Sequence, residues 1–428
     1  MINRTINPNN DLKLNTTNID RSNLLPQFHK MDNGNNIVCF NSQSVDIVKI
    51  DFVFEAGKAY QSHKLSAMIA NKLITEGTSK HSAKEIAEIL DYRGIYIDKN
   101  IDSTTATVSV LMVKKYVLEI LPLLHEILTD AVFPENEFQI TINKSKQRFL
   151  NEMMKTNYVA RRTFYQNIFG MEHVYGSFAS EEDFDKLTVD NVREFYNKNY
   201  HIDNCKIFVS GNIDDNILVT INQLFGQTKH SPLLAPIVPK PVFMQPTQVY
   251  IEKADAVQST IRIGKVIDTT WDTTDFTEIM LANTILGGYF GSKLTANVRE
   301  DKGYCYSIYS MVQAFRGANV FFITTEVGKG VTHDAAKEIY NELANMSTQP
   351  ISNDELEVVK SYLIGDFIRS IDGVFEIADR YKTMVTSHSS EVFTDNYLNT
   401  IDSITPEKIC QISAKYLNKD SMTQIIVG

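Results

Sequence analysis

The sequence repeats the order of its segments at an offset of about 217 residues. Three pairs of segments match: 133–138 with 351–356, 187–192 with 404–409, and 206–211 with 423–428. In each copy the first member opens a long predicted helix and the last is a short apolar strand ending in glycine. An offset of this size is too long for a solenoid and indicates duplication of a whole domain.

Within each copy, strand and helix patterns are mixed without strict alternation. In the first copy, Ile47–Phe54 and Thr104–Val113 are predicted strands, and Val117–Leu128 is a strongly apolar predicted helix containing Pro122. A helical pattern covers Glu135–Phe169 and is expected to break near Lys155. This mixture favours an α+β fold, with two homologous domains that each pack an antiparallel or mixed sheet against helices.

A proline-rich stretch marks the boundary between the two domains. Residues 231–246 contain five of the 11 prolines, which is typical of an extended linker. Residues 1–24 are polar and rich in asparagine, so they are predicted to form a loosely attached arm. The expected domains are therefore 25–230 and 247–428.

Composition limits the classes of partner. The formal net charge is −10 and basic runs are short, which argues against nucleic acid or an anionic membrane surface. No apolar run reaches the roughly 18 residues that a membrane span needs. The N-terminal residues also lack the apolar segment that a secretory signal contains. The four cysteines form no C-x-x-C, and Cys39, Cys205 and Cys305 lie in apolar runs. Buried free thiols and a cytoplasmic location are expected.

The stretch from Leu286 to Ser310 carries the most specific chemistry. A corner at Gly303 places Arg299 at a helix end and Tyr306 early on the returning strand, so the two side chains can approach one another. A planar guanidinium beside a hydroxyl suits a peptide carbonyl or a terminal carboxylate. The alternative is an ordinary surface arginine and a half-buried strand tyrosine.

This stretch, together with the duplication, resembles the pitrilysin/insulinase-type zinc peptidases, the inverzincins, whose zinc motif is H-x-x-E-H. The resemblance covers nearly the whole chain after the N-terminal arm. It implies two homologous α+β domains, and it implies that Arg299 and Tyr306 match the family's second-domain pair that holds the substrate backbone near the metal.

The zinc motif itself is missing. Counting back from Gly77-Thr78, the segment that stands in its place is Met68-Ile69-Ala70-Asn71-Lys72. A catalytic zinc needs two imidazoles at i and i+4 and a glutamate that activates water, and this segment supplies none of them. Glu152 matches the family's third ligand, but one carboxylate cannot hold a catalytic zinc, and His63 lies five residues before Met68. The sequence therefore predicts no metal site and no catalytic residue in this chain.

Several members of the family work as pairs in which one chain has lost the metal. The resemblance thus implies a non-catalytic, peptide-binding subunit whose Arg299 and Tyr306 complete a site on a metal-bearing homologue, with zinc in that partner. A homodimer is expected when the partner is absent. The alternative is a structural subunit that binds no peptide. The net charge of −10 would favour basic or neutral peptides.

Overall fold

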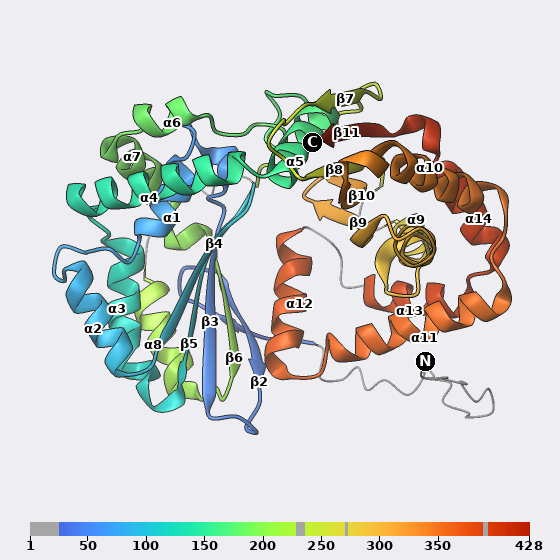
Figure 1. Cartoon of the computed structure of the whole chain (residues 1–428). Helices are drawn as coiled ribbons and strands as arrows, with labels where there is room; N and C mark the ends of the chain where they lie inside the picture. Colours follow the sequence, from blue (N-terminus) through green and yellow to red (C-terminus); the bar gives the residue numbers. More distant parts are fainter. Residues whose placement is uncertain (1–24, 228–235, 270–272, 388–392) are drawn as a thin grey trace.

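A computed structural model describes residues 25–227, 236–269, 273–387 and 393–428 (Figure 1). The predicted N-terminal arm and the first residues of the predicted linker lie outside the described residues. Within the described ranges, none of the helices combines the length and the hydrophobicity that a membrane crossing requires.

The chain builds two separate β-sheets. The six-stranded sheet has the order β1-β2-β6-β3-β5-β4, and the five-stranded sheet has the order β7-β11-β8-β10-β9. The strands of the first sheet are β1 (Gln27–Lys30), β2 (Asn36–Asn41), β3 (Ile47–Phe54), β4 (Tyr96–Ile101), β5 (Ala106–Val113) and β6 (Cys205–Gly211). Those of the second are β7 (Gln248–Ile251), β8 (Gln258–Ile267), β9 (Cys305–Phe315), β10 (Ala318–Gly328) and β11 (Thr423–Val427).

The two sheets share one topology. In each, a single parallel pair (β2 with β6, β7 with β11) is followed by three antiparallel pairings. Strand β6 therefore corresponds to β11, and β4 corresponds to β9 at the far edge. The predicted α+β fold with a duplicated mixed sheet is confirmed.

Helices surround both sheets. The first half contains α1 (Ser66–Leu73), α2 (Ala83–Tyr92), α3 (Val117–Thr129), α4 (Glu135–Met153), α5 (Thr156–Phe169), α6 (Glu181–Lys186), α7 (Val189–Asn199) and α8 (Asp215–Phe225). The second contains α9 (Thr274–Asn283), α10 (Thr332–Thr348), α11 (Asn353–Arg369), α12 (Val374–Thr386), α13 (Phe393–Ser403) and α14 (Pro406–Tyr416). The predicted long helix breaks at Lys155, whose extended backbone separates α4 from α5.

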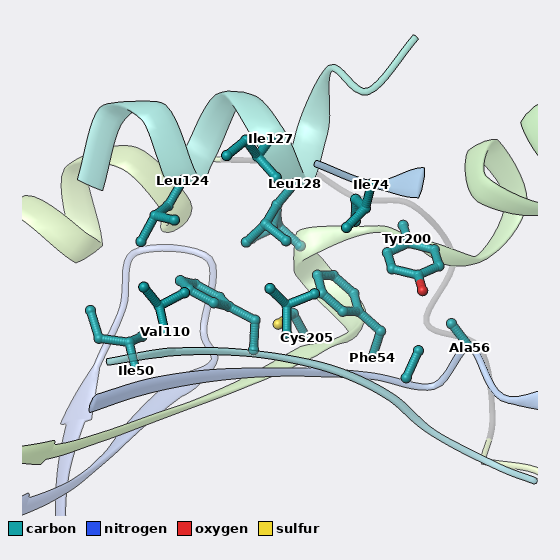
Figure 2. Close-up of a cluster of buried hydrophobic side chains, with 14 of the residues drawn as sticks. Ile50, Phe54, Ala56, Ile74, Val110, Leu124, Ile127, Leu128, Tyr200 and Cys205 are labelled. Carbon is teal, nitrogen blue, oxygen red and sulfur yellow. The ribbon is translucent and has the colours of Figure 1, made fainter. Parts of the chain in front are cut away.

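Helix α3 covers one face of the first sheet. Figure 2 shows Leu124 and Leu128 of α3 directed at the strands that carry Ile50 and Phe54, and all four side chains are buried. The Phe54 ring also packs 4.8 Å from the ring of Tyr200. Burial of this apolar surface is the main force that holds α3 on the sheet.

The other face of each sheet is covered by a helix from the opposite half. Helix α5 of the first half packs on β8 and β11 of the second sheet, and α12 of the second half packs on β2 and β6 of the first (Figure 1). Corresponding aromatic contacts join Phe164 to Phe322 and Tyr381 to Phe40. Since α5 and α12 follow corresponding long helices in the two copies, the exchange is reciprocal.

A buried ion pair lies where the two halves meet. Arg316, in the turn between β9 and β10, donates to both carboxylate oxygens of Glu55, at 2.6 and 3.1 Å. It also donates to the carbonyl of Thr386 at the end of α12, at 2.9 Å. The Tyr60 hydroxyl donates to Glu55 and accepts from the backbone N–H of Ile237. These contacts connect both sheets, the exchanged helix α12 and the described part of the linker.

This ion pair should make stability depend on pH in the acid range. Burial alone would raise the pKa of Glu55, but hydrogen bonding and charge from Arg316, with help from Lys206, hold that pKa below its ordinary value of 4.5. A lowered folded-state pKa gives stability that is present above pH 4.5 and lost as the pH falls through the folded pKa. We expect urea midpoints of the wild type and of Glu55→Gln to differ most at neutral pH and to converge in acid. A gap that stays constant down to strongly acidic pH would contradict this.

Candidate functional site

Helix α1 presents none of the chemistry that a zinc site requires. Ile69 and Asn71 are buried, and the Asn71 amide donates to the Tyr200 hydroxyl at 3.3 Å. Lys72 donates to the Ser145 hydroxyl at 2.9 Å, which places a cation where the second imidazole would stand. His63 is exposed and precedes the helix, and its carbonyl accepts from Ser66. These donors do not fit a zinc ion.

Glu152, the residue that matches the third ligand, lies at the end of α4. Its carboxylate pairs with Lys155 at 2.7 Å. A hydrogen bond from Lys155 is the main cause that lowers the pKa of Glu152. No three histidine, cysteine, aspartate or glutamate side chains gather closely enough to hold a metal in the part of the chain that the structure describes.

A cavity of about 410 Å³ lies beside helix α1. Met68, Asn71 and Lys72 of α1 line it, together with Glu152 and residues 99–101 of the edge strand β4. The lining is basic, with six lysine and arginine side chains to one glutamate. The acidic net charge of the chain would suggest an acidic lining. The lining is nevertheless basic, since a total charge does not say where the individual charges lie.

A second cavity of about 330 Å³ adjoins the first, because Glu152, Tyr158 and Arg161 line both. Its opposite wall is formed by the second sheet, with Ser307 and Tyr309 of β9 and residues 324–326 of β10. The two cavities together lead from the helix that has lost the zinc motif to the edge strand of the second sheet.

Arg299 and Tyr306 are positioned by irregular backbone. Arg299 lies in a π-helical turn, Thr295–Asp301, and such turns are frequent at functional sites. Gly303 has φ +64°, the left-handed conformation that the predicted corner needs. On β9, Tyr306 and Ser307 together stand opposite the single residue Glu326, as in a β-bulge, because the register shifts between Thr325 and Val327. A bulge turns side chains out of the regular alternation.

The result is a cluster of one half-buried cation and two exposed rings. The Arg299 guanidinium carbon lies 5.7 Å from the centre of the Tyr306 ring and 4.9 Å from that of Phe290. Tyr306 is 86% exposed and Phe290 is 68% exposed. No carboxylate among the described residues forms an ion pair with Arg299 within 4.0 Å. Neither Arg299 nor Tyr306 lines either of these two cavities, although Ser307, next to Tyr306, lines the second one.

Phe290, which lies in the segment Gly-Tyr-Phe-Gly, was not among the site residues predicted from the sequence. A single signal could have found it. A large aromatic residue between glycines, just after an apolar helix, has no regular face on which to be buried.

The chain is similar to known proteins over most of its length. Residues 186–363 match the family model described as "Peptidase M16 inactive domain". The chain is 22% identical over 407 residues to "Uncharacterized zinc protease YmxG" of Bacillus subtilis, covering 92% of this chain and 96% of that protein. It is 22% identical over 244 residues to "Probable inactive metalloprotease YmfF" of the same organism, covering 57% of this chain and 56% of that protein.

Among solved structures, the fold is similar to that of a peptidase M16 inactive domain from Pseudomonas fluorescens. The TM-score is 0.84 at 20% sequence identity, and the match covers 94% of this chain and 98% of that one. The family model and the second of these relatives are both described as inactive, in line with the altered zinc helix. Together these findings support a non-catalytic protein of the M16 type, the pitrilysin/insulinase-type peptidases, in which the H-x-x-E-H motif is absent.

Proposed function

We propose that this chain is the non-catalytic, peptide-binding subunit of a two-chain zinc peptidase. It supplies Arg299 and Tyr306 to a site that a metal-bearing homologue completes. The observation that carries the proposal is the Arg299 guanidinium, which lies near two exposed rings and forms no ion pair with a carboxylate among the described residues. A guanidinium in that state is ready to donate to a carbonyl or carboxylate from another molecule.

Peptide would lie extended along the trough formed by the two cavities. Strand β4 forms one edge of the first sheet and β9 forms one edge of the second, and both border the cavities. An exposed edge offers unpaired backbone groups to an extended peptide. Arg299 would hold a peptide carbonyl and the Tyr306 hydroxyl would donate to a neighbouring one. The partner's zinc would supply the activated water.

The proposal predicts a loss of cleavage when either side chain is changed. We expect peptidase activity only when this chain is co-expressed with an H-x-x-E-H homologue from the same organism. Activity of the complex should fall at least tenfold with Arg299→Ala or with Tyr306→Phe, about 1.4 kcal/mol of transition-state stabilisation. The measurement is kcat/KM on a quenched fluorescent peptide.

Two matched variants control for changes at the surface. Arg369→Ala removes an exposed arginine on α11, and Tyr92→Phe removes the hydroxyl of a tyrosine on α2 that is 84% exposed. Both should leave cleavage unchanged. If the partner cleaves peptides equally well alone, or if the complex tolerates Arg299→Ala and Tyr306→Phe, the chain is a structural subunit instead.

A further inference from the structure

The first cavity collects cations from distant parts of the chain. Among the residues that the structure describes, Glu152 is the only acidic one that lines it. Its six basic residues are Lys58, Lys64, Lys72, Lys99, Arg148 and Arg161. They come from α1, the loop before it, the edge strand β4 and helices α4 and α5. In a chain with net charge −10, this is a local reversal of sign.

Most of these cations form no close ion pair, although Arg148 and Arg161 interact electrostatically with Glu152, and Lys58 with Asp102. Lys99 pairs with Glu76 at 3.6 Å and Lys64 with Asp183 at 3.9 Å. Glu152 is engaged by Lys155, which is not among the residues that line this cavity. Among the described residues, no carboxylate forms an ion pair within 4.0 Å with the remaining four, Lys58, Lys72, Arg148 and Arg161.

Lys72 is central to this arrangement. Its ammonium group donates to Ser145, whose side chain is neutral, and the Lys72 carbonyl accepts from the ammonium of Lys99 at 2.6 Å. Burial, then the charges of Arg148 and Lys99, lower the pKa of Lys72. Crowded like charges beside a cavity disfavour the empty state, and an anion that enters would relieve the repulsion.

The cavity is also placed to receive a side chain from an extended peptide. Lys99, Asn100 and Ile101 line it, and they belong to β4, at the edge of the six-stranded sheet. A strand added at that edge would project alternate side chains toward the cavity and away from it. A cavity of about 410 Å³ lies in the range typical of ligand sites.

We propose that the cavity beside the altered zinc helix binds a carboxylate of the peptide, through Lys72 and Arg148, and so selects acidic peptides. The inference rests on the proposed peptide-binding function and adds the class of substrate to it. The position that holds a cation in the zinc-bearing members holds an anion in this chain. The carboxylate comes from an acidic side chain or from the peptide C-terminus.

Fluorescence anisotropy of the isolated full chain with three labelled peptides tests this proposal. The first carries an internal glutamate and an amidated C-terminus. The second has glutamine in place of the glutamate. The third is the glutamine peptide with a free C-terminal carboxylate. We expect the first or the third to bind at least tenfold more tightly than the second, and which of them does so identifies the source of the carboxylate. The difference should shrink as salt is added.

Variants of the cavity locate the effect. Lys72→Met and, separately, the exposed Arg148→Met should each reduce the preference for the carboxylate at least threefold. The matched control is Lys144→Met, which removes the same charge from the exposed side of α4 and lies outside this cavity. Because Arg148 is exposed, its replacement tests the cavity even if Lys72→Met fails to fold.

Three outcomes would overturn the proposal. Equal affinity for all three peptides would remove the selectivity and leave the proposed peptide binding intact. An equal loss with Lys144→Met would assign the preference to the general field of the surface. Failure of every peptide to bind would also reject it, while the cleavage experiment with the partner decides the proposed function separately.

Discussion

Replacing Arg316 with alanine is expected to lower the free energy of unfolding by about 3–5 kcal/mol, the cost of leaving a buried charge without its partner. The side chains of Arg316 and Glu55 are 1% and 7% exposed, so water cannot replace the lost hydrogen bonds. The same change removes the donors to the carbonyl of Thr386 at the end of α12. Urea denaturation followed by circular dichroism measures the effect.

Two further variants separate the ion pair from a general loss of an arginine. Arg369→Ala removes an exposed arginine paired with Asp366, and it should change stability by no more than about 1 kcal/mol. The double variant Arg316→Met with Glu55→Leu removes both charges and should recover part of the loss. If the double variant were less stable than Arg316→Ala, the charges themselves would stabilise the contact between the two halves.

Replacing Phe164 with alanine is expected to cost about 3–5 kcal/mol, the usual range for a fully buried aromatic residue. Phe164 is on α5, is completely buried and packs against the second sheet. A β-carbon at Gly264 on β8 would lie 3.0 Å from the ring and 2.1 Å from the carbonyl oxygen of Phe321. The absence of a side chain there makes room for the ring, so its removal leaves a cavity between the halves.

Phe290→Ala is the control for this change, because Phe290 is a phenylalanine of the same size at the surface. It should alter stability by less than about 0.5 kcal/mol. Thermal unfolding of both variants gives the comparison. If Phe164→Ala were as mild as Phe290→Ala, the contact between α5 and the second sheet would contribute little to the stability of the fold.

Local elements were predictable because their signals lie within a few residues. The strand predicted for Ile47–Phe54 has the same bounds as β3, and a capping box between Ser82 and Glu85, a signal within four residues, begins α2. The interpretation of Cys305 as a buried thiol was wrong. It is half-buried, because it begins β9, the edge strand that has a neighbour on one side only.

Features that join distant segments were not predictable. The apolar residues of α5 predict that this helix packs against another element. The sequence does not reveal that this element is the second sheet. The basic cavity was not predictable, because each of its cations taken alone has the sequence surroundings of a solvated surface residue. Arg299 and Tyr306 could be paired from the corner at Gly303, whereas the π-helical turn and the bulge that orient them have no clear sequence signal.

The reciprocal placement of α5 and α12 has a consequence for how the chain reaches its native state. Neither sheet has both faces covered until the whole polypeptide is present, so a half produced by itself would expose a broad apolar surface to water. We expect the protein to melt as one cooperative unit and a separated half to aggregate. During synthesis, the second face of the first sheet stays uncovered until α12 has been made, more than 160 residues after β6 ends at Gly211.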